Sequence, residues 1–169
     1  GIAMRKVAIV MGSDSDLKTM QAAADMLEKF QVPCCLRILS AHRTPDACRA
    51  FALSAREEGY GAIIAGAGKA AHLAGALAAS TTLPVIGVPI KSSTLDGLDA
   101  LLSTVQMPTG MPVATVAIDG AANAALLAVQ MLAIEDGALA EKYAAYRQET
   151  TRKVLEKDEA LAKEAAHNA

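Results

Sequence analysis

Three short polar segments hold the side chains of this 169-residue chain that could do chemistry. Residues 12–16 read GSDSD, residues 40–45 read SAHRTP, and residues 66–75 read GAGKAAHLAG. Together they supply hydroxyl groups, carboxylates, an arginine, a lysine and two histidines, with small residues between them. Side chains of these types can bind a phosphate and a ribose and can move protons near neutral pH.

The first segment offers a phosphate site. Its backbone N–H groups, beginning at Gly12, and the hydroxyls of Ser13 and Ser15 stand before a predicted helix, whose dipole favours an anion at its N-terminus. Asp16 could accept hydrogen bonds from the hydroxyls of a ribose. Serine and aspartate are also ordinary helix-capping residues, and taken alone this segment is better explained as a helix cap.

The second segment places His42 beside Arg43. The guanidinium group of an arginine presents a fork of donors that suits a phosphate. A histidine can give and take protons near neutrality, because its unperturbed pKa is about 6.5. A single loop histidine is often structural, so at this point the functional and the structural interpretations both stay open.

The third segment imitates two phosphate-binding motifs. Residues 66–71 match the loose dinucleotide fingerprint, but no acidic residue stands about 20 residues further on to bind a ribose, so this remains a weak alternative. Its Gly-Lys pair resembles the end of a P-loop, yet Ile63 and Ala70 occupy positions where that motif needs Gly and Ser or Thr. We expect instead a loop whose small residues let the backbone approach a flat ligand closely. His72 lies inside it, either in the site or as a structural residue at a helix N-terminus.

These segments follow predicted strands. Continuous apolar runs that alternate with helical patterns are typical of a parallel sheet covered on both faces. We predict a three-layer α/β/α sandwich with a doubly wound, mostly parallel five-stranded sheet, of the flavodoxin-like or Rossmann-like type. Ligands of such sheets bind beyond the carboxyl ends of the strands, which is where the three segments stand. Strands are expected over residues 5–11, 33–39, 61–65, 84–88 and 112–118, and helices over 17–30, 44–58, 70–80, 96–105, 121–134 and from 138 to near the end.

One domain is expected over residues 4–169, because the chain is short enough for a single core. Within it, residues 136–169 are expected to form a C-terminal helical arm, since apolar content falls there and charges dominate. The arm could be a solvated helix or could cross onto another subunit. Residues 1–3 are expected to be a cloning remnant ahead of a native Met4.

Composition narrows the classes of partner. Apolar residues make up 53% of the chain and the net charge is −2, which excludes a disordered protein. Lys and Arg total 16 against 18 Asp and Glu, and aromatics are 3%, so we expect no nucleic-acid partner. No apolar run reaches about 18 residues, so we expect no membrane span. The 37 alanines suggest close packing between subunits as well as within one.

The numbers of cysteines and histidines indicate whether the chain can bind a metal and in which cellular compartment it resides. The three cysteines include one vicinal pair and do not form a disulfide framework. Reduced thiols are usual in the cytoplasm, where we expect the protein to reside. With only three histidines and no metal-binding spacing, we expect no metal site.

Taken in order, these segments resemble the PurE family, and within it the class I branch. The resemblance covers about residues 5–135. It implies an enzyme of purine biosynthesis that converts N5-carboxyaminoimidazole ribonucleotide into 4-carboxy-5-aminoimidazole ribonucleotide, with no metal or organic cofactor, and that forms a homo-octamer. The matching pieces are VAIVMGSDSD (7–16), SAHRTPD (40–46), GYGAIIAGAG (59–68), AAHL (70–73), LPVIGVP (83–89), VQMPTGMPVATVAI (105–118) and NAALLA (123–128).

The resemblance also implies roles for residues. Ser13, Ser40 and Arg43 would hold the 5′-phosphate, Asp16 the ribose hydroxyls, and His42 would be the catalytic acid and base. His72 and the glycine-rich loop would line the pocket around the carboxylate or CO2. The full candidate set is His42 and His72 as catalytic residues, with Gly12, Ser13, Ser15, Asp16, Ser40, Ala41, Arg43, Gly68, Lys69, Ala70, Ala71 and Leu73 binding the substrate.

Two departures from the family pattern and two alternatives remain. Lys69 stands where the family usually has glycine, and Ala74 where it has proline. Lys69 could contact the substrate carboxylate, although we expect it to point to solvent.

Class II members are carboxylases that use free CO2; they carry lysine at the position of Arg43 and lack a counterpart of His72, so the mutase is favoured here. A non-catalytic nucleotide-binding module is the other alternative.

Overall fold

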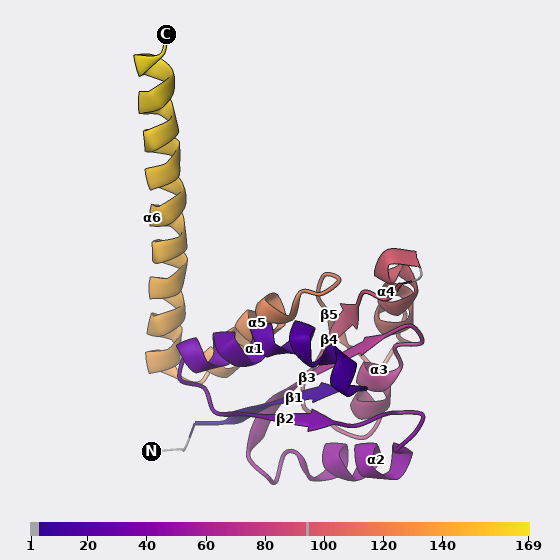
Figure 1. Ribbon diagram of the computed structural model, residues 1–169. Coiled ribbons are helices and arrows are strands. Elements are labelled where there is room, and N and C mark those ends of the chain that lie inside the picture. Colours follow the sequence, from indigo (N-terminus) through magenta and orange to yellow (C-terminus); the bar gives the residue numbers. More distant parts are fainter. Residues whose placement is uncertain (1–3, 94) are drawn as a thin grey trace.

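A computed structural model, which describes residues 4–93 and 95–169, places the strands in one parallel sheet of order β2-β1-β3-β4-β5 (Figure 1). This is the strand order of the flavodoxin-like doubly wound fold, so the predicted fold class is confirmed. The expectation for residues 1–3 falls outside the described residues. The strands are β1 (Lys6–Met11), β2 (Cys34–Ile38), β3 (Tyr60–Gly68), β4 (Val85–Ile90) and β5 (Ala114–Thr115).

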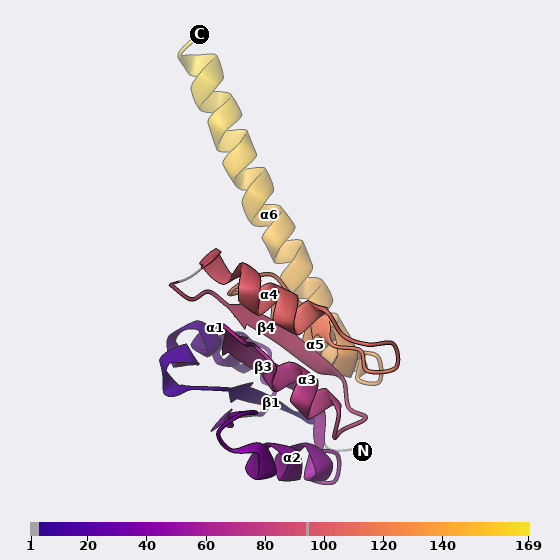
Figure 2. The same cartoon turned by 90° about the vertical axis from the view of Figure 1, so that its right-hand side faces the viewer.

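Helices cover both faces of this sheet, α1 and α5 on one and α2 and α3 on the other (Figures 1 and 2). α4 packs against β4 and lies next to α3. Short 3-10 turns precede α1 at Asp14–Asp16 and α4 at Leu95–Gly97. The helices are α1 (Leu17–Lys29), α2 (Pro45–Ser54), α3 (Leu73–Ala78), α4 (Leu98–Val105), α5 (Ala121–Ala133) and α6 (Gly137–His167).

The central strands β1, β3 and β4 are buried on both faces, which explains why they are continuous apolar runs, whereas most of the edge strand β2 is exposed. In β1, Val7 and Ile9 enter the core under α1 and α5, whereas Ala8 and Val10 enter the core over α2 and α3. All four side chains are fully buried. Successive side chains of a strand point to opposite faces, so one strand feeds both cores.

The end of β3 differs from the prediction. The strand was expected to end at residue 65, but its pairing with β4 continues as far as Gly68, which lies opposite Ile90. A Cβ atom at Gly68 would be 3.2 Å from the Ile90 carbonyl oxygen, so glycine permits this close approach. Gly66 therefore lies inside a strand, and α3 begins only at Leu73. The dinucleotide fingerprint needs a turn at this place that leads directly into a helix, so that alternative is wrong.

Two further elements are shorter than expected. β5 has the two residues Ala114–Thr115 instead of residues 112–118. It is an edge strand, and its start is limited by Pro112, which has no N–H to donate to a neighbouring strand. α2 ends at Ser54 instead of residue 58 and is followed by turns that lead to Gly59, whose φ is 90°.

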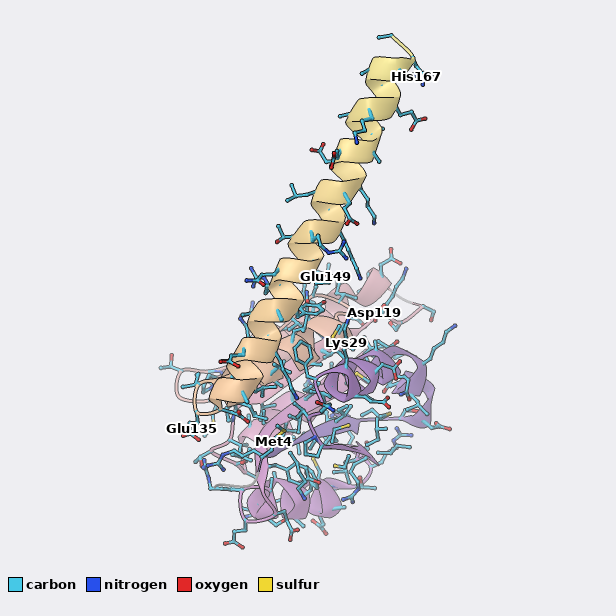
Figure 3. All side chains as sticks on the ribbon, turned by 90° about the vertical axis from the view of Figure 1, so that its left-hand side faces the viewer. Met4, Lys29, Asp119, Glu135, Glu149 and His167 are labelled. Atoms are coloured by element: carbon cyan, nitrogen blue, oxygen red, sulfur yellow. The ribbon has the colours of Figure 1, made fainter. Side chains whose placement is uncertain are left out.

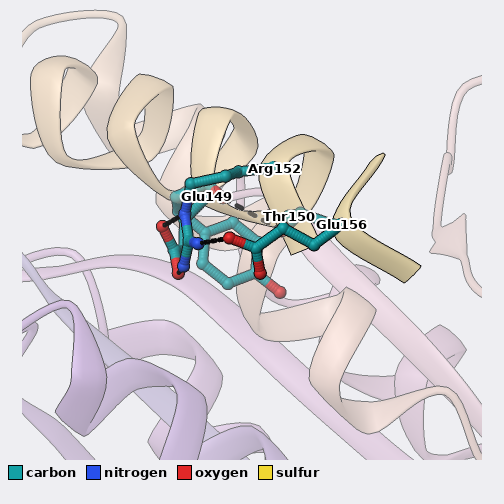
Figure 4. A network of polar contacts seen from close by, with 5 residues as sticks. Glu149, Thr150, Arg152 and Glu156 are labelled. Atoms are coloured by element: carbon teal, nitrogen blue, oxygen red, sulfur yellow. Dashed lines mark hydrogen bonds and ion pairs between the residues drawn. The ribbon is translucent and has the colours of Figure 1, made fainter. Parts of the chain in front are cut away.

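The C-terminal helix α6 leaves the rest of the molecule after its first turns (Figures 1 and 3). Leu139 is buried. The centroid of the Phe30 ring lies 6.3 Å from that of Tyr143 and 5.4 Å from that of Tyr146. Further along, exposed charges pair within the helix, and Arg152 bonds to both Glu149 and Glu156 (Figure 4). None of the described helices combines the length and the apolar content that crossing a membrane requires.

Candidate functional site

The carboxyl ends of β1, β2, β3 and β4 surround a pocket of about 780 Å³. A parallel sheet brings these ends to one edge, so segments that are far apart in the sequence meet there. The described residues that line the pocket are Gly12, Ser13, Ser15, Asp16, Thr19, Ser40, Ala41, His42, Arg43, Ala67, Gly68, Lys69, Ala70, His72, Leu73, Ile90, Lys91 and Ser92.

The pocket gathers all but one of the candidate residues. The exception is Ala71, whose side chain is buried and which instead supports the turn through a hydrogen bond from its N–H to the Lys69 carbonyl. The structure adds Thr19, Ala67 and the end of β4 at residues 90–92. The end of β4 could have been found from the sequence, because the rule that selected the other segments applies to it equally.

The segment after β1 is a capped turn. Ser13 is the N-cap of the first 3-10 turn, and its Oγ accepts hydrogen bonds from the Ser15 N–H at 3.3 Å and the Ser15 hydroxyl at 3.1 Å. Ser13 therefore caps this turn, and both Ser13 and Ser15 line the pocket. Burial raises the pKa of Asp16, although its hydrogen bond with the Ser13 backbone and the positive charge of Arg43 act in the opposite direction.

Arg43 ties the first two segments together. Its Nη2 donates to the Gly12 carbonyl at 2.9 Å, and its Nε donates to Ser40 Oγ at 3.4 Å. Ser40 Oγ also accepts the Arg43 backbone N–H at 3.0 Å. The guanidinium group is thus held between Gly12 and Ser40, where it can take part in binding an anion.

His42 and His72 form a pair inside the pocket. His42 Nε2 lies 2.9 Å from His72 Nδ1, and the two rings meet edge to face with centroids 5.0 Å apart. This hydrogen bond needs a proton on one of the two nitrogens and a lone pair on the other. The pair can therefore donate a proton from one ring while the other ring accepts one, which is what acid–base catalysis requires.

The turn after β3 carries Lys69 in a left-handed conformation, with a φ of 51°. Such a φ costs a residue other than glycine about 1–2 kcal/mol, so Lys69 adds strain to this turn. Backbone bonds within the turn, including one from the His72 N–H to the Ala70 carbonyl at 2.9 Å, bring His72 to the start of α3.

Positive charge dominates the pocket. Among the charged side chains in its described lining, Arg43, Lys69 and Lys91 are cations and Asp16 is the anion. Cations gathered in a cleft attract and orient anionic ligands. Across the described part of the chain, no three His, Cys, Asp or Glu side chains gather in a way that could hold a metal ion.

Comparison with known proteins relates this chain to one enzyme family. Residues 6–153 match the family model described as AIR carboxylase. The N5-carboxyaminoimidazole ribonucleotide mutase of Pyrococcus abyssi is 57% identical over 151 residues, which cover 89% of this chain and 87% of that protein. The enzyme of the same name from Escherichia coli K12 is 56% identical over 153 residues, which cover 89% and 90%. The crystal structure of Treponema denticola PurE superposes with a TM-score of 0.84 at 28% identity and covers 93% of this chain and 98% of that one.

Proposed function

The chain belongs to the AIR carboxylase family, and we propose that its pocket converts N5-carboxyaminoimidazole ribonucleotide into 4-carboxy-5-aminoimidazole ribonucleotide. This mutase reaction of purine biosynthesis moves a carboxylate from the exocyclic nitrogen to carbon 4 of the imidazole ring. The high identity to mutases over nearly the whole chain carries this conclusion. The paired histidines and the positive charge of the pocket support it, because the substrate is an anion and must exchange protons.

In this proposal the nucleotide lies across the pocket with its phosphate near β1 and β2. Ser13, Ser40 and Arg43 bind the 5′-phosphate, with backbone contacts from Gly12 and Ala41. Asp16 accepts hydrogen bonds from the ribose hydroxyls, and Ser15 supports Ser13. The imidazole ring then faces the turn after β3, where small residues permit a close approach; that turn supplies Gly68, Lys69, Ala70 and Leu73, and Ala71 acts through the backbone.

His42 is the acid and base of the reaction. When the bond between nitrogen and carboxylate breaks, its electron pair stays on the nitrogen, CO2 is released, and protonated His42 gives the nitrogen a proton. Carbon 4 then attacks CO2 to form the new carbon–carbon bond. Neutral His42 removes the proton of carbon 4, which restores the aromatic ring and returns the histidine to its starting state.

His72 supports His42 through their hydrogen bond. It orients the His42 ring, because an imidazole held at one nitrogen has little freedom to turn. The same turn places His72 near the imidazole ring of the substrate. CO2 must stay close to carbon 4 until it is attacked, and we infer that His72 and the glycine-rich turn hold it there.

An isotopic label in the migrating carboxylate tests the function. Purified protein is incubated with carboxylate-labelled N5-carboxyaminoimidazole ribonucleotide, a metal chelator and unlabelled bicarbonate, and the product is analysed by mass spectrometry. We expect labelled product above the rate of a protein-free control. Unlabelled product, with a carboxylate taken from the bicarbonate in solution, would indicate the carboxylase that uses free CO2. Nucleotide binding without any product would indicate a non-catalytic binding module.

We further propose that the protein self-associates, as a homo-octamer. Large apolar side chains are exposed on the edge strand β2 and on α2, namely Leu36, Ile38 and Leu53. Both histidines of the pair are also exposed in the single chain, and a neighbouring copy at the pocket would shield the reaction from water. Light scattering coupled to gel filtration should give eight times the chain mass of 17.4 kDa, and a monomeric mass would contradict the proposal.

We also propose that the protein works in the cytoplasm. All three of its cysteines are free thiols, which suits a reducing compartment. Fractionation of the source cells, followed by detection with an antibody, would test this location.

A further inference from the structure

One cation of the pocket has no role in the reaction described above. Lys91 follows β4 directly and lines the pocket between Ile90 and Ser92. Its side chain is 56% exposed, so its ammonium group is accessible to a ligand that enters the pocket.

Asp119 fixes the backbone on which Lys91 stands. Asp119 Oδ1 accepts a hydrogen bond from the Lys91 N–H at 2.9 Å, and the Asp119 N–H donates to the Pro89 carbonyl at 2.8 Å. These two bonds hold the chain on both sides of Ile90. Asp119 has a φ of 59°, a left-handed conformation that few residues other than glycine, asparagine and aspartate adopt. The end of β4 is therefore held in place by a residue from the segment before α5.

Lys91 and Arg43 follow strands at different positions in the sheet. Arg43 follows β2, and the strand order places β1 and β3 between β2 and β4. Neighbouring strands lie about 4.8 Å apart, so the ends of β2 and β4 are separated by about 14 Å. The Arg43 guanidinium is held at its own side by the Gly12 carbonyl and Ser40 Oγ. When Arg43 binds one anionic group of a ligand, Lys91 remains available to bind a second one.

The ion pair between Lys91 and Asp96 is weak. Lys91 Nζ lies 3.6 Å from Asp96 Oδ1, and the Asp96 side chain is 91% exposed. Exposed ion pairs of this kind contribute little free energy, because water competes for both charges. A carboxylate inside the pocket can therefore replace Asp96 as the partner of Lys91.

We propose, on the basis of the mutase function above, that Lys91 binds the migrating carboxylate and that Asp119 is the residue that positions Lys91. A nucleotide whose phosphate lies near β1 and β2 extends its imidazole ring toward β3 and β4. Its two negative groups then meet separate cations, the phosphate at Arg43 and the carboxylate at Lys91. The assignment makes Lys91 a residue that distinguishes carboxylated from uncarboxylated nucleotides.

Calorimetric binding of two nucleotides tests the role of Lys91. The probes are 4-carboxy-5-aminoimidazole ribonucleotide and 5-aminoimidazole ribonucleotide, which lacks the carboxylate. Lys91→Gln should weaken binding of the first about tenfold and change binding of the second by less than about twofold. Asp96→Asn should strengthen binding of the carboxylated nucleotide, because Lys91 loses its competing partner. Lys157→Gln, which removes a lysine charge from the exposed part of α6, is the matched control and should change neither affinity.

Two substitutions of Asp119 separate positioning from folding. Asp119→Asn keeps an oxygen that can accept the Lys91 N–H and tolerates the left-handed φ. Asp119→Gly relieves the backbone conformation but removes the acceptor. We expect the first variant to bind both nucleotides like the wild type, and the second to lose affinity for the carboxylated nucleotide alone.

The outcomes separate this assignment from the function on which it rests. Equal losses for both nucleotides in Lys91→Gln, or no loss for either, would overturn the role of Lys91. Equal losses for both nucleotides in Asp119→Gly would reduce Asp119 to a structural residue. If the wild type converts the labelled substrate while Lys91→Gln shows no selective loss, the mutase function stands and only this assignment falls.

Discussion

His42 Nε2 lies 2.9 Å from His72 Nδ1, although the two residues are 30 positions apart in the chain. Each histidine lies in the polar segment that follows a strand, β2 for His42 and β3 for His72, and β1 lies between those strands in the sheet. The pair joins the two segments in the lining of the pocket. A hydrogen bond between two imidazoles needs a proton on one nitrogen and a lone pair on the other, so the two rings meet as donor and acceptor.

Replacing His42 should remove catalysis while leaving nucleotide binding. His42→Asn cannot transfer a proton to or from the substrate, and general acid–base catalysis contributes about 100- to 10,000-fold to rates. We expect turnover to fall at least about 100-fold, with the affinity for 4-carboxy-5-aminoimidazole ribonucleotide unchanged within about threefold. Steady-state kinetics and calorimetry on the same preparation measure both. Turnover near the wild-type rate would show that another group carries the proton.

Replacing His72 should reveal whether the histidines act as a unit. His72→Asn removes the ring that orients His42, and we expect a loss of turnover of about 10- to 100-fold, smaller than the loss in His42→Asn. Groups that act together give effects that do not add. The double variant should therefore be no slower than His42→Asn alone. Multiplicative losses would show that the two rings work independently.

Arg43 should contribute to binding through the phosphate. Arg43→Gln removes the charge next to the serines, and we expect the affinity for the carboxylated ribonucleotide to fall by about 10- to 100-fold. The corresponding nucleoside, which lacks the phosphate, provides the comparison. The nucleoside should bind more weakly than the nucleotide, and its affinity should be the same for the wild type and the variant. An equal loss for nucleoside and nucleotide would place Arg43 away from the phosphate.

Asp16 should lower the stability of the folded protein at neutral pH. Burial raises its folded-state pKa above the ordinary value of 3.8, so the folded chain binds a proton there more readily than the unfolded chain. Ionised Asp16 therefore opposes folding above its folded-state pKa, and that penalty disappears as the pH falls through it. Asp16→Asn should raise the Tm near neutral pH by less than about 3 °C, because Asp16 is only half-buried, and should weaken nucleotide binding. Melting curves from about pH 7 down to about pH 4 should show the gain shrinking, and a constant or growing gain would contradict this explanation.

Gly87 should be essential for packing between β4 and two helices. A Cβ atom there would overlap with Thr104 Cγ2 and would lie 3.0 Å from Val113 Cγ1 and 3.4 Å from Ala74 Cβ. Overpacking of a core costs about 1–3 kcal/mol, so Gly87→Ala should lower the Tm by about 3–10 °C.

Gly75→Ala is the matched control for the Gly87 substitution. Its nearest neighbours are the flexible Met107 Sδ and Cε at 3.3 and 3.4 Å, and alanine favours the helix by about 0.5–1 kcal/mol. Thermal unfolding of both variants measures the difference. Equal stabilities would show that the core adapts at Gly87.

The sequence by itself determined the class of fold and most of the pocket lining. Apolar runs such as residues 61–65 alternate with helical patterns, and a parallel sheet covered on both faces buries such runs. The carboxyl ends of its strands then lie at one edge, so residues 12–16 and 40–43 had to meet there. Both features follow from local sequence pattern, which is why the sequence alone predicts them.

Only the tertiary structure decided the contacts between segments. The continuation of β3 to Gly68 depends on its pairing with β4. The hydrogen bond from the Lys91 N–H to Asp119 joins residues 28 positions apart. The same holds for the bond between His42 and His72, which depends on the order of strands in the sheet. Local sequence sets where a strand lies and which face it buries. It does not set which distant backbone comes within hydrogen-bond distance, because those contacts form only when the whole sheet and its helices are packed.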